Sequence, residues 1–188
     1  MKRGKGFTLI ELLIVVAIIG ILAALLIPNA MMAMQKAKQK GTMKDINTIA
    51  TACIDYITDH GEAPANGYNT QLSQSDEFVD AVSPFYIKVC PLEDQWGHAF
   101  YVSTGTAAGG NDFNITITSA QADDFVIGSS GRNEDTDDVS YSSSDPNSGL
   151  YEVSSMDDFN NEIVNWNGSM VIGPRTGGST STSTSTGG

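Results

Sequence analysis

The feature that most constrains this chain is an apolar run near its N-terminus. From Phe7 to Ile27 the sequence is apolar apart from Thr8, Gly20 and a single carboxylate, Glu11. At about 1.5 Å per residue, a helix of this length spans the roughly 30 Å hydrocarbon core of a bilayer. A carboxylate inside a membrane helix costs several kcal/mol, so Glu11 is a candidate functional residue. The run therefore predicts a transmembrane helix that carries one functional acid.

The segment before this run is basic and ends in glycine. It reads Met1-Lys2-Arg3-Gly4-Lys5-Gly6, followed by Phe7-Thr8-Leu9-Ile10-Glu11. This order resembles the class III signal of type IV prepilins and type II secretion pseudopilins, which is cut between the glycine and the phenylalanine. The resemblance implies cleavage between Gly6 and Phe7, methylation of the new amine, and an apolar segment that is retained.

The same resemblance gives Glu11 a role in assembly, in which it attracts the Phe7 amine of a neighbouring subunit. An ammonium and a carboxylate without water attract strongly, and we expect that only a partner subunit satisfies both. Two simpler interpretations of Glu11 stay open, namely an acid near the membrane interface and a plain signal-anchor helix.

The charge distribution limits what the chain binds and how it is oriented. Its formal net charge is -12, and of the 22 acidic residues only Glu11 precedes Asp45. The part from Asp45 onward therefore repels nucleic acid and anionic membrane surfaces. Lys2, Arg3 and Lys5 favour a cytoplasmic N-terminus by the positive-inside rule, which places the acidic part outside the cytoplasmic membrane.

The helical pattern continues beyond the apolar run. Pro28 should kink or loosen the helix, and the pattern then continues to His60, where Gly61 and Pro64 end it. Four lysines lie early in this continuation, and they form either a belt that pairs with acidic heads of other subunits or a solvated face. These lysines are Lys36, Lys38, Lys40 and Lys44.

The remainder is large enough for one small domain. We expect a short second helix over residues 74–82, strand segments over 115–118, 125–128, 150–153, 163–166 and 169–172, and a helical turn over 156–160. The five expected regions are a leader (1–6), a transmembrane and assembly helix (7–28), its amphipathic continuation (29–60), a head (61–175) and a disordered Ser/Thr/Gly tail (176–188).

A second resemblance lies near Trp96. The segment Leu92-Glu-Asp-Gln-Trp-Gly-His-Ala-Phe-Tyr-Val102 resembles the D-P-W-G-N-P-Y-x-Y segment of the G-type major pseudopilin of type II secretion. Gln95 stands in place of the usual proline, and His98-Ala99 in place of Asn-Pro. The resemblance implies an altered turn with the same aromatic anchors.

Only two cysteines are present, Cys53 and Cys90. An exported location permits a disulfide, and we expect these two to pair. Two buried free thiols are the alternative, because Cys53 lies on the apolar face of the helix.

Residues 128–139 form an acidic loop in which Glu134, Asp135, Asp137 and Asp138 place four carboxylates within five positions. Carboxylate and carbonyl oxygens are the ligands that Ca²⁺ prefers. The EF-hand pattern fails here, but G-type pseudopilins hold calcium in the corresponding loop. The resemblance implies ligands from the carbonyl of Ile127 and the side chains of Asp137 and Asp138, with Asp135 a further candidate. Ser130 stands where the family usually has aspartate, and a solvated acidic loop is the alternative.

Together these features predict an α+β fold of the type IV pilin-like class. A long N-terminal helix, half transmembrane and half amphipathic, packs on a small antiparallel β-sheet domain with a short second helix. The two histidines stand in neither an H-E-x-x-H nor a C-x-x-C-H motif, and neither a P-loop nor a G-x-S-x-G sequence occurs, so we expect no enzyme.

The resemblance implies a structural subunit of the helical pseudopilus that drives type II secretion across the outer membrane. The implied location is the bacterial inner membrane, crossed once, with a periplasmic head. The implied partners are further copies in a filament, minor pseudopilins, the prepilin peptidase and methyltransferase, and the inner-membrane assembly platform. Two other functions remain open: a major or minor pilin of a type IV pilus, serving adhesion, motility or DNA uptake, and a monomeric membrane-anchored binding domain.

Overall fold

The computed structural model describes residues 7–66, 70–111, 113–136 and 138–175. The chain divides into two compact units, residues 1–37 and 38–188. The leader (1–6) and the Ser/Thr/Gly tail (176–188) predicted above lie outside the described residues.

The first long element is α1, Leu9–His60. Leucine, isoleucine and alanine dominate its first half, and no glycine or proline stops it. The helix continues without interruption through Pro28, so it does not unwind there, and the kink expected at Pro28 stays a prediction. Asn29 Nδ2 donates to the Leu25 carbonyl at 3.3 Å, next to the bond that Pro28 cannot make. The helix ends as predicted, because Gly61 adopts a φ of +80° and its N–H bonds the Ile57 carbonyl at 2.7 Å.

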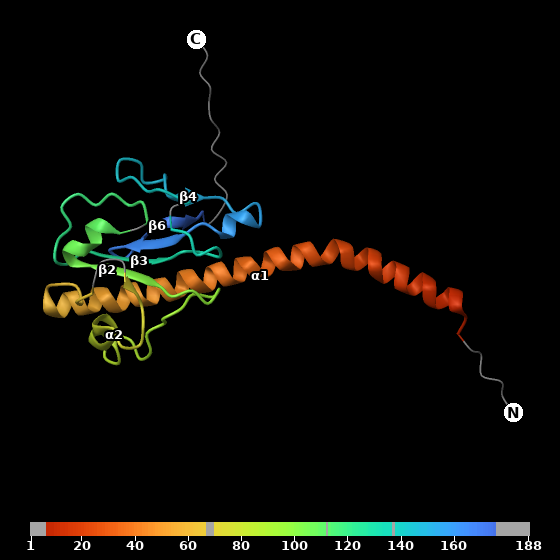
Figure 1. Cartoon of the computed structure of the whole chain (residues 1–188), viewed down its shortest axis with the longest axis horizontal. Helices are drawn as coiled ribbons and strands as arrows, with labels where there is room; N and C mark the ends of the chain where they lie inside the picture. The colour runs from red at the N-terminus through yellow and green to blue at the C-terminus, as the bar shows by residue number, and fades with distance from the viewer. Residues whose placement is uncertain (1–6, 67–69, 112, 137, 176–188) are drawn as a thin grey trace, which may run out of the picture. The chain divides into compact units, whose positions relative to one another are not determined.

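The second unit contains one sheet (Figure 1). Its strands occur in the spatial order β1-β2-β3-β5-β6-β4, and all neighbours are antiparallel except β4 and β6. The strands are β1 (Thr70–Gln71), β2 (Tyr101–Thr104), β3 (Phe125–Ser129), β4 (Leu150–Tyr151), β5 (Ile163–Trp166) and β6 (Ser169–Pro174). Three short helical segments complete the unit: α2 (Glu77–Val82), and the 3₁₀ helices η1 (Gly105–Gly110) and η2 (Asp157–Phe159).

The predicted β3, β5 and β6 are confirmed, and β5 joins β6 through Asn167-Gly168. Both residues have positive φ, +49° and +85°, which matches the type I′ turn that Asn-Gly favours.

β1 and β2 were not predicted. Residues 115–118 do not form the predicted strand, since Ile115 makes one isolated bridge to Tyr141. Ile115 and Ile117 are buried while Thr116 and Thr118 are exposed. Alternating apolar and polar residues indicate that one side of a segment is buried. A loop that lies on the sheet produces this pattern as well as a strand does.

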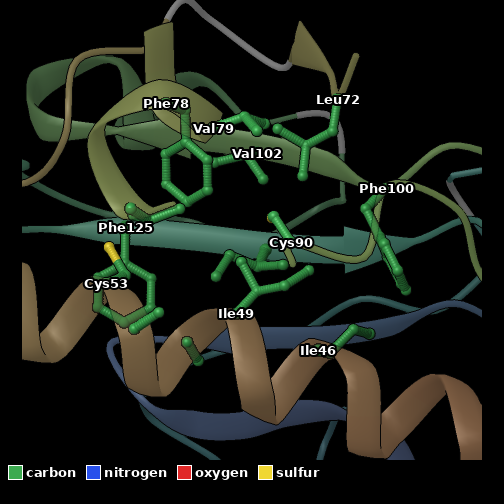
Figure 2. Close-up of a cluster of buried hydrophobic side chains, with 14 of the residues drawn as sticks. Ile46, Ile49, Cys53, Leu72, Phe78, Val79, Cys90, Phe100, Val102 and Phe125 are labelled. Atoms are coloured by element: carbon green, nitrogen blue, oxygen red, sulfur yellow. The ribbon is translucent and has the colours of Figure 1, made fainter. Parts of the chain in front are cut away.

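Two apolar clusters cover the two faces of the sheet. The first lies between α1, α2 and the sheet, and Figure 2 shows side chains from all three facing one another. The second lies beneath the segment that includes Phe113, Ile115 and Ile117. Successive residues of β3 serve both clusters, with Ile127 in the first and Val126 in the second. This period of two explains why every residue of β3 is buried.

Candidate functional site

Thr8 and Glu11 form a reciprocal cap at the start of α1. The Thr8 backbone N–H and hydroxyl donate to Glu11 Oε2 at 2.9 and 2.7 Å, and the Glu11 N–H donates to Thr8 Oγ1 at 3.3 Å. This is the capping box, for which T-x-x-E is the sequence signal, and it was not among the expectations above. We expected that only a neighbouring subunit could satisfy the Glu11 carboxylate. This is wrong for its hydrogen bonds, which Thr8 of the same chain supplies, although Thr8 provides no positive charge to balance that of Glu11.

The described residues do not cover the apolar segment that follows. Every large apolar side chain from Phe7 to Ile27 is exposed, and Phe7 itself is 82% exposed. Within the described residues, α1 is the one helix that is long and apolar enough to cross a membrane. Gly6, the other half of the predicted cleavage site, lies outside the described residues.

Asp94 organises the Trp96 turn. Its Oδ1 accepts the backbone N–H groups of Trp96, Gly97 and His98 at 2.8, 2.9 and 3.0 Å. Its Oδ2 accepts the Ser129 hydroxyl at 2.6 Å, and the residue is only 6% exposed. The turn is thereby joined to the end of β3.

Gln95 joins the same turn to α1. Its backbone N–H donates to Thr42 Oγ1 at 3.2 Å, and its Nε2 donates to Asp45 Oδ2 at 2.8 Å. Proline, the usual residue at this position in the resembled segment, has no N–H and could not make the first bond. Gly41 provides the space, because a Cβ there would stand 2.8 Å from Gln95 Cγ. The departure from the family pattern thus adds a contact between helix and turn.

His98 ties the turn to the acidic loop. Its Nδ1 lies 2.9 Å from the Gly131 carbonyl oxygen. Gly131 has a φ of +70°, and a Cβ there would stand 2.3 Å from the Asn160 carbonyl oxygen. A glycine is therefore required where this loop begins.

Glu162 holds the far end of the loop. Its two carboxylate oxygens accept the N–H groups of Asp138 and Val139 at 2.7 and 3.1 Å, and the residue has no exposed surface. Burial raises the pKa of Glu162 to about 7, against the opposing effect of these hydrogen bonds. Sequence reasoning missed this residue, because a single glutamate before an apolar strand carries no signal of burial.

The expected calcium ligands differ in how accessible they are to an ion. Ile127 lies inside β3, paired with Val102 on one side and Asn165 on the other. Carbonyls in such a central strand serve the ladder, so Ile127 does not stand at the strand end as expected. Asp135 and Asp138 are exposed.

Their carboxylates already have partners within the loop. Asp135 Oδ1 accepts the Thr136 N–H at 2.9 Å, and Asp138 Oδ2 accepts Asn133 Nδ2 at 3.0 Å. Asp137 lies outside the described residues, and among those described no three His, Cys, Asp or Glu side chains are arranged to hold a metal.

One polar atom at this loop has no partner. The buried Ser130 hydroxyl makes no hydrogen bond within the described part of the chain. It occupies the position where the resembled family usually has an aspartate.

Both cysteines are buried free thiols, so the expected disulfide is absent from the structure. They belong to the same apolar cluster, and Figure 2 shows Cys53 on α1 and Cys90 among the side chains that face it. Burial raises the pKa of Cys53 to about 12 and that of Cys90 to about 11. Each thiol therefore packs as a small apolar side chain, with Cys90 Sγ 3.7 Å from the Pro91 carbonyl oxygen.

The two histidines have structural contacts. His60 stacks on Tyr56 with ring centroids 4.0 Å apart, and its Nδ1 lies 3.0 Å from the Tyr56 carbonyl oxygen. His98 lies in the Trp96 turn, as expected.

Comparison with known proteins gives a consistent result. Residues 1–27 match the model of the prokaryotic N-terminal methylation motif. Type II secretion system core protein G of Klebsiella pneumoniae is 28% identical over 144 residues, covering 74% of this chain and 94% of that protein. The protein of the same name from Aeromonas hydrophila is 33% identical over 104 residues, covering 53% of this chain and 72% of the relative.

The type IV major pilin PilA of Myxococcus xanthus is 41% identical, but over 75 residues that cover 35% of this chain and 34% of that pilin. No solved structure matches. The core protein G of Aeromonas hydrophila is more than 30% identical over more than two thirds of its own length, whereas the pilin match covers about a third of each chain. The chain therefore belongs to the type II secretion system core protein G family.

Proposed function

We propose that this protein is the structural subunit of a pseudopilus, a helical filament that drives type II protein secretion. The observation that carries the proposal is the match to core protein G relatives, which covers 53% to 74% of this chain. The uncovered apolar segment from Phe7 to Ile27 supports it, because such a surface is stable only in lipid or against other copies. A filament supplies the second of these environments after the membrane has supplied the first.

The proposed location is the bacterial inner membrane, crossed once, with the head in the periplasm. The basic residues Lys2, Arg3 and Lys5 support a cytoplasmic N-terminus. The partners we propose are further copies of the chain, minor pseudopilins, the prepilin peptidase and methyltransferase, and the inner-membrane assembly platform. The acidic head opposes a role in binding nucleic acid.

Processing between Gly6 and Phe7 is part of the proposal. Peptide mass spectrometry of the mature protein should find an N-terminal peptide that begins at Phe7 and is one methyl group heavier than its sequence. A mature chain that still begins at Met1 would remove the basis for assembly through the Phe7 amine.

A type IV pilus pilin is the competing function, supported by the short match to PilA. Deletion of the gene distinguishes the two. A pseudopilus subunit is required for proteins to reach the culture medium, while surface motility and DNA uptake persist without it. The reverse pattern would establish a pilin, and retention of both activities would favour a monomeric anchored binding domain. Re-expression of the unchanged chain is the control.

We further propose that the acidic loop, residues 128–139, binds Ca²⁺ through Asp135, Asp137 and Asp138. Four carboxylates within five positions and the unpaired buried hydroxyl of Ser130 support this proposal. Ile127 is the least suited of the expected ligands, because its carbonyl lies inside a central strand. A bound cation would relieve the repulsion among these carboxylates and fix the loop beside the Trp96 turn.

The calcium proposal is tested on the fragment that begins at Lys38, which contains both apolar clusters. Its unfolding free energy should rise by about 2.7 kcal/mol when Ca²⁺ exceeds the dissociation constant a hundredfold. The Asp135→Asn, Asp138→Asn double variant should lose this rise while unfolding cooperatively. Identical unfolding in chelator and in millimolar Ca²⁺ would refute the calcium site without bearing on the filament.

A further inference from the structure

Two large apolar side chains project from the surface of the second unit. Phe85 is 81% exposed and Val89 is 74% exposed. Among the described residues of this unit, the one other exposed large apolar side chain is Ile54, at 41%. An exposed pair of this kind, held in one short loop before Cys90, marks an interaction surface.

A groove lies beside the same loop. It has a volume of about 620 Å³, and its walls come from one side of α1 and from Tyr86 and Ile87. The lining residues on α1 are Lys40, Met43, Lys44, Asn47, Thr48, Thr51 and Ala52. The groove adjoins the core of this unit, since Ala52 belongs to the first apolar cluster and Met43, Tyr86 and Ile87 pack against that cluster.

The charge of this surface is opposite to that of the rest of the unit. Lys40 and Lys44 line the groove, and Lys88 follows Ile87 in the projecting loop. All three are exposed, and the one ion pair within the described residues joins Arg132 to Asp157 instead. Among the described residues, those that line the groove include no acid. We define the groove face as Phe85, Val89, Lys88 and the groove-lining residues.

We propose that the groove face docks a second copy of this chain, which meets it with an acidic surface. The inference rests on the proposed filament and names one contact within it. Charge complementarity supports a second copy as the occupant, because the chain from Asp45 onward has 21 acidic residues and only three basic ones, one of which is Lys88 itself. Any acidic surface outside the groove face can therefore supply carboxylates to the unpaired lysines.

The same charges decide the kind of contact. If two groove faces met each other, Lys40 and Lys44 of one copy would oppose those of the other, which like-charge repulsion disfavours. The contact is therefore heterologous, with the groove face of one copy against a different face of the next. Heterologous contacts that do not close into a ring generate open helical filaments.

The first test is filament yield in cells that carry the secretion machinery. Lys40→Glu with Lys44→Glu should lower the yield at least tenfold, and Phe85→Ser should also lower it. Lys40→Arg with Lys44→Arg keeps the charge and should leave the yield unchanged. Thermal unfolding of each variant fragment from Lys38 shows whether the head still folds, so that loss of the fold is not mistaken for loss of docking.

The second test places a photo-crosslinking amino acid at position 85 of the full chain. Irradiated filaments should yield an adduct with another copy of the chain, at a peptide rich in Asp and Glu. An adduct only with phospholipid or with a different protein would overturn the inference, as would filaments that form without any adduct.

Glu11→Ala separates this inference from the filament itself. If Glu11→Ala abolishes filaments while the double lysine reversal leaves them intact, the pseudopilus function stands and the groove face is not the contact. If the unchanged chain forms no filament, the proposed function falls and this inference with it.

Discussion

The Ser129 hydroxyl donates to Asp94 Oδ2 at 2.6 Å, and this buried bond joins the Trp96 turn to the end of β3. The other oxygen of Asp94 closes the turn itself through three successive backbone N–H groups. One carboxylate therefore fixes both the shape of the turn and its position on the sheet. Since Gln95 of the same turn bonds Thr42 and Asp45, the contact extends from the sheet to α1.

Asp94→Ala should destabilise the second unit strongly. It leaves three N–H groups and the Ser129 hydroxyl without their acceptor, at a cost of about 3 kcal/mol. The thermal midpoint of the fragment from Lys38 should fall by about 10 °C. Asp94→Asn keeps one acceptor oxygen and should lose less than half as much. Equal midpoints for the Ala variant and the unchanged fragment would show that the turn does not depend on Asp94.

Replacement of Glu11 separates its two roles, the cap and the charge. Glu11→Gln keeps an acceptor for Thr8 but removes the charge that attracts an incoming amine. If the charge drives assembly, Gln and Ala variants should both lose filaments, since an unpaired ammonium in lipid costs several kcal/mol.

Thr8→Val is the matched control for the cap. It removes only the hydroxyl contacts of the capping box and should cost about 1 kcal/mol of helix stability, with filaments still formed. Filaments from the Gln variant, counted by electron microscopy, would assign Glu11 to capping instead.

Stability should depend on pH through Glu162. Its pKa is raised to about 7 in the folded state, above the ordinary value of 4.5. Between these two values the folded state retains a proton that the unfolded chain has lost. The free energy of unfolding should therefore fall as pH rises from about 4.5 to about 7, by up to about 1.4 kcal/mol per pH unit.

Glu162→Gln tests this dependence. The variant should be less stable, because one N–H of Asp138 or Val139 loses its carboxylate acceptor. Its profile should also lack the fall attributed to Glu162. Denaturant titrations of both proteins at several pH values in chelator give the difference, and parallel profiles would contradict the assignment.

The cysteines should be unreactive in the folded chain. Burial raises the pKa of Cys53 to about 12 and of Cys90 to about 11, so little thiolate is present at pH 8. Alkylation without reductant should label neither thiol in the native protein and both after unfolding. Mass measurement of an unfolded, unreduced sample that takes up no label would establish the disulfide that the sequence suggested.

The N-terminal third could be predicted because its constraints are local. An apolar run of this length, a basic segment ending in glycine and one acid at Glu11 are visible in order along the chain, and the predicted helix end at His60 is confirmed. The capping box was not predicted, although Thr8-x-x-Glu11 is its sequence signal and its contacts join residues only three apart. The β5–β6 hairpin was equally local, because Asn167-Gly168 sets the turn that pairs its strands.

The head depended on contacts between residues far apart in sequence. Asp94 and Ser129, which are hydrogen-bonded, are 35 residues apart in sequence, and Glu162 and Asp138 are 24 apart. No rule of sequence spacing predicts either pair. Residues 115–118 alternate like a strand yet cover the sheet, because alternation fixes which side chains are buried but not what they are buried against. The sequence alone determined the membrane-length helix and its acid. Tertiary packing decided which carboxylates were buried and hydrogen-bonded. It also decided which charges, such as those of Lys40 and Lys44, faced solvent. The reason is that desolvation of a charge depends on neighbours that only the folded chain brings together.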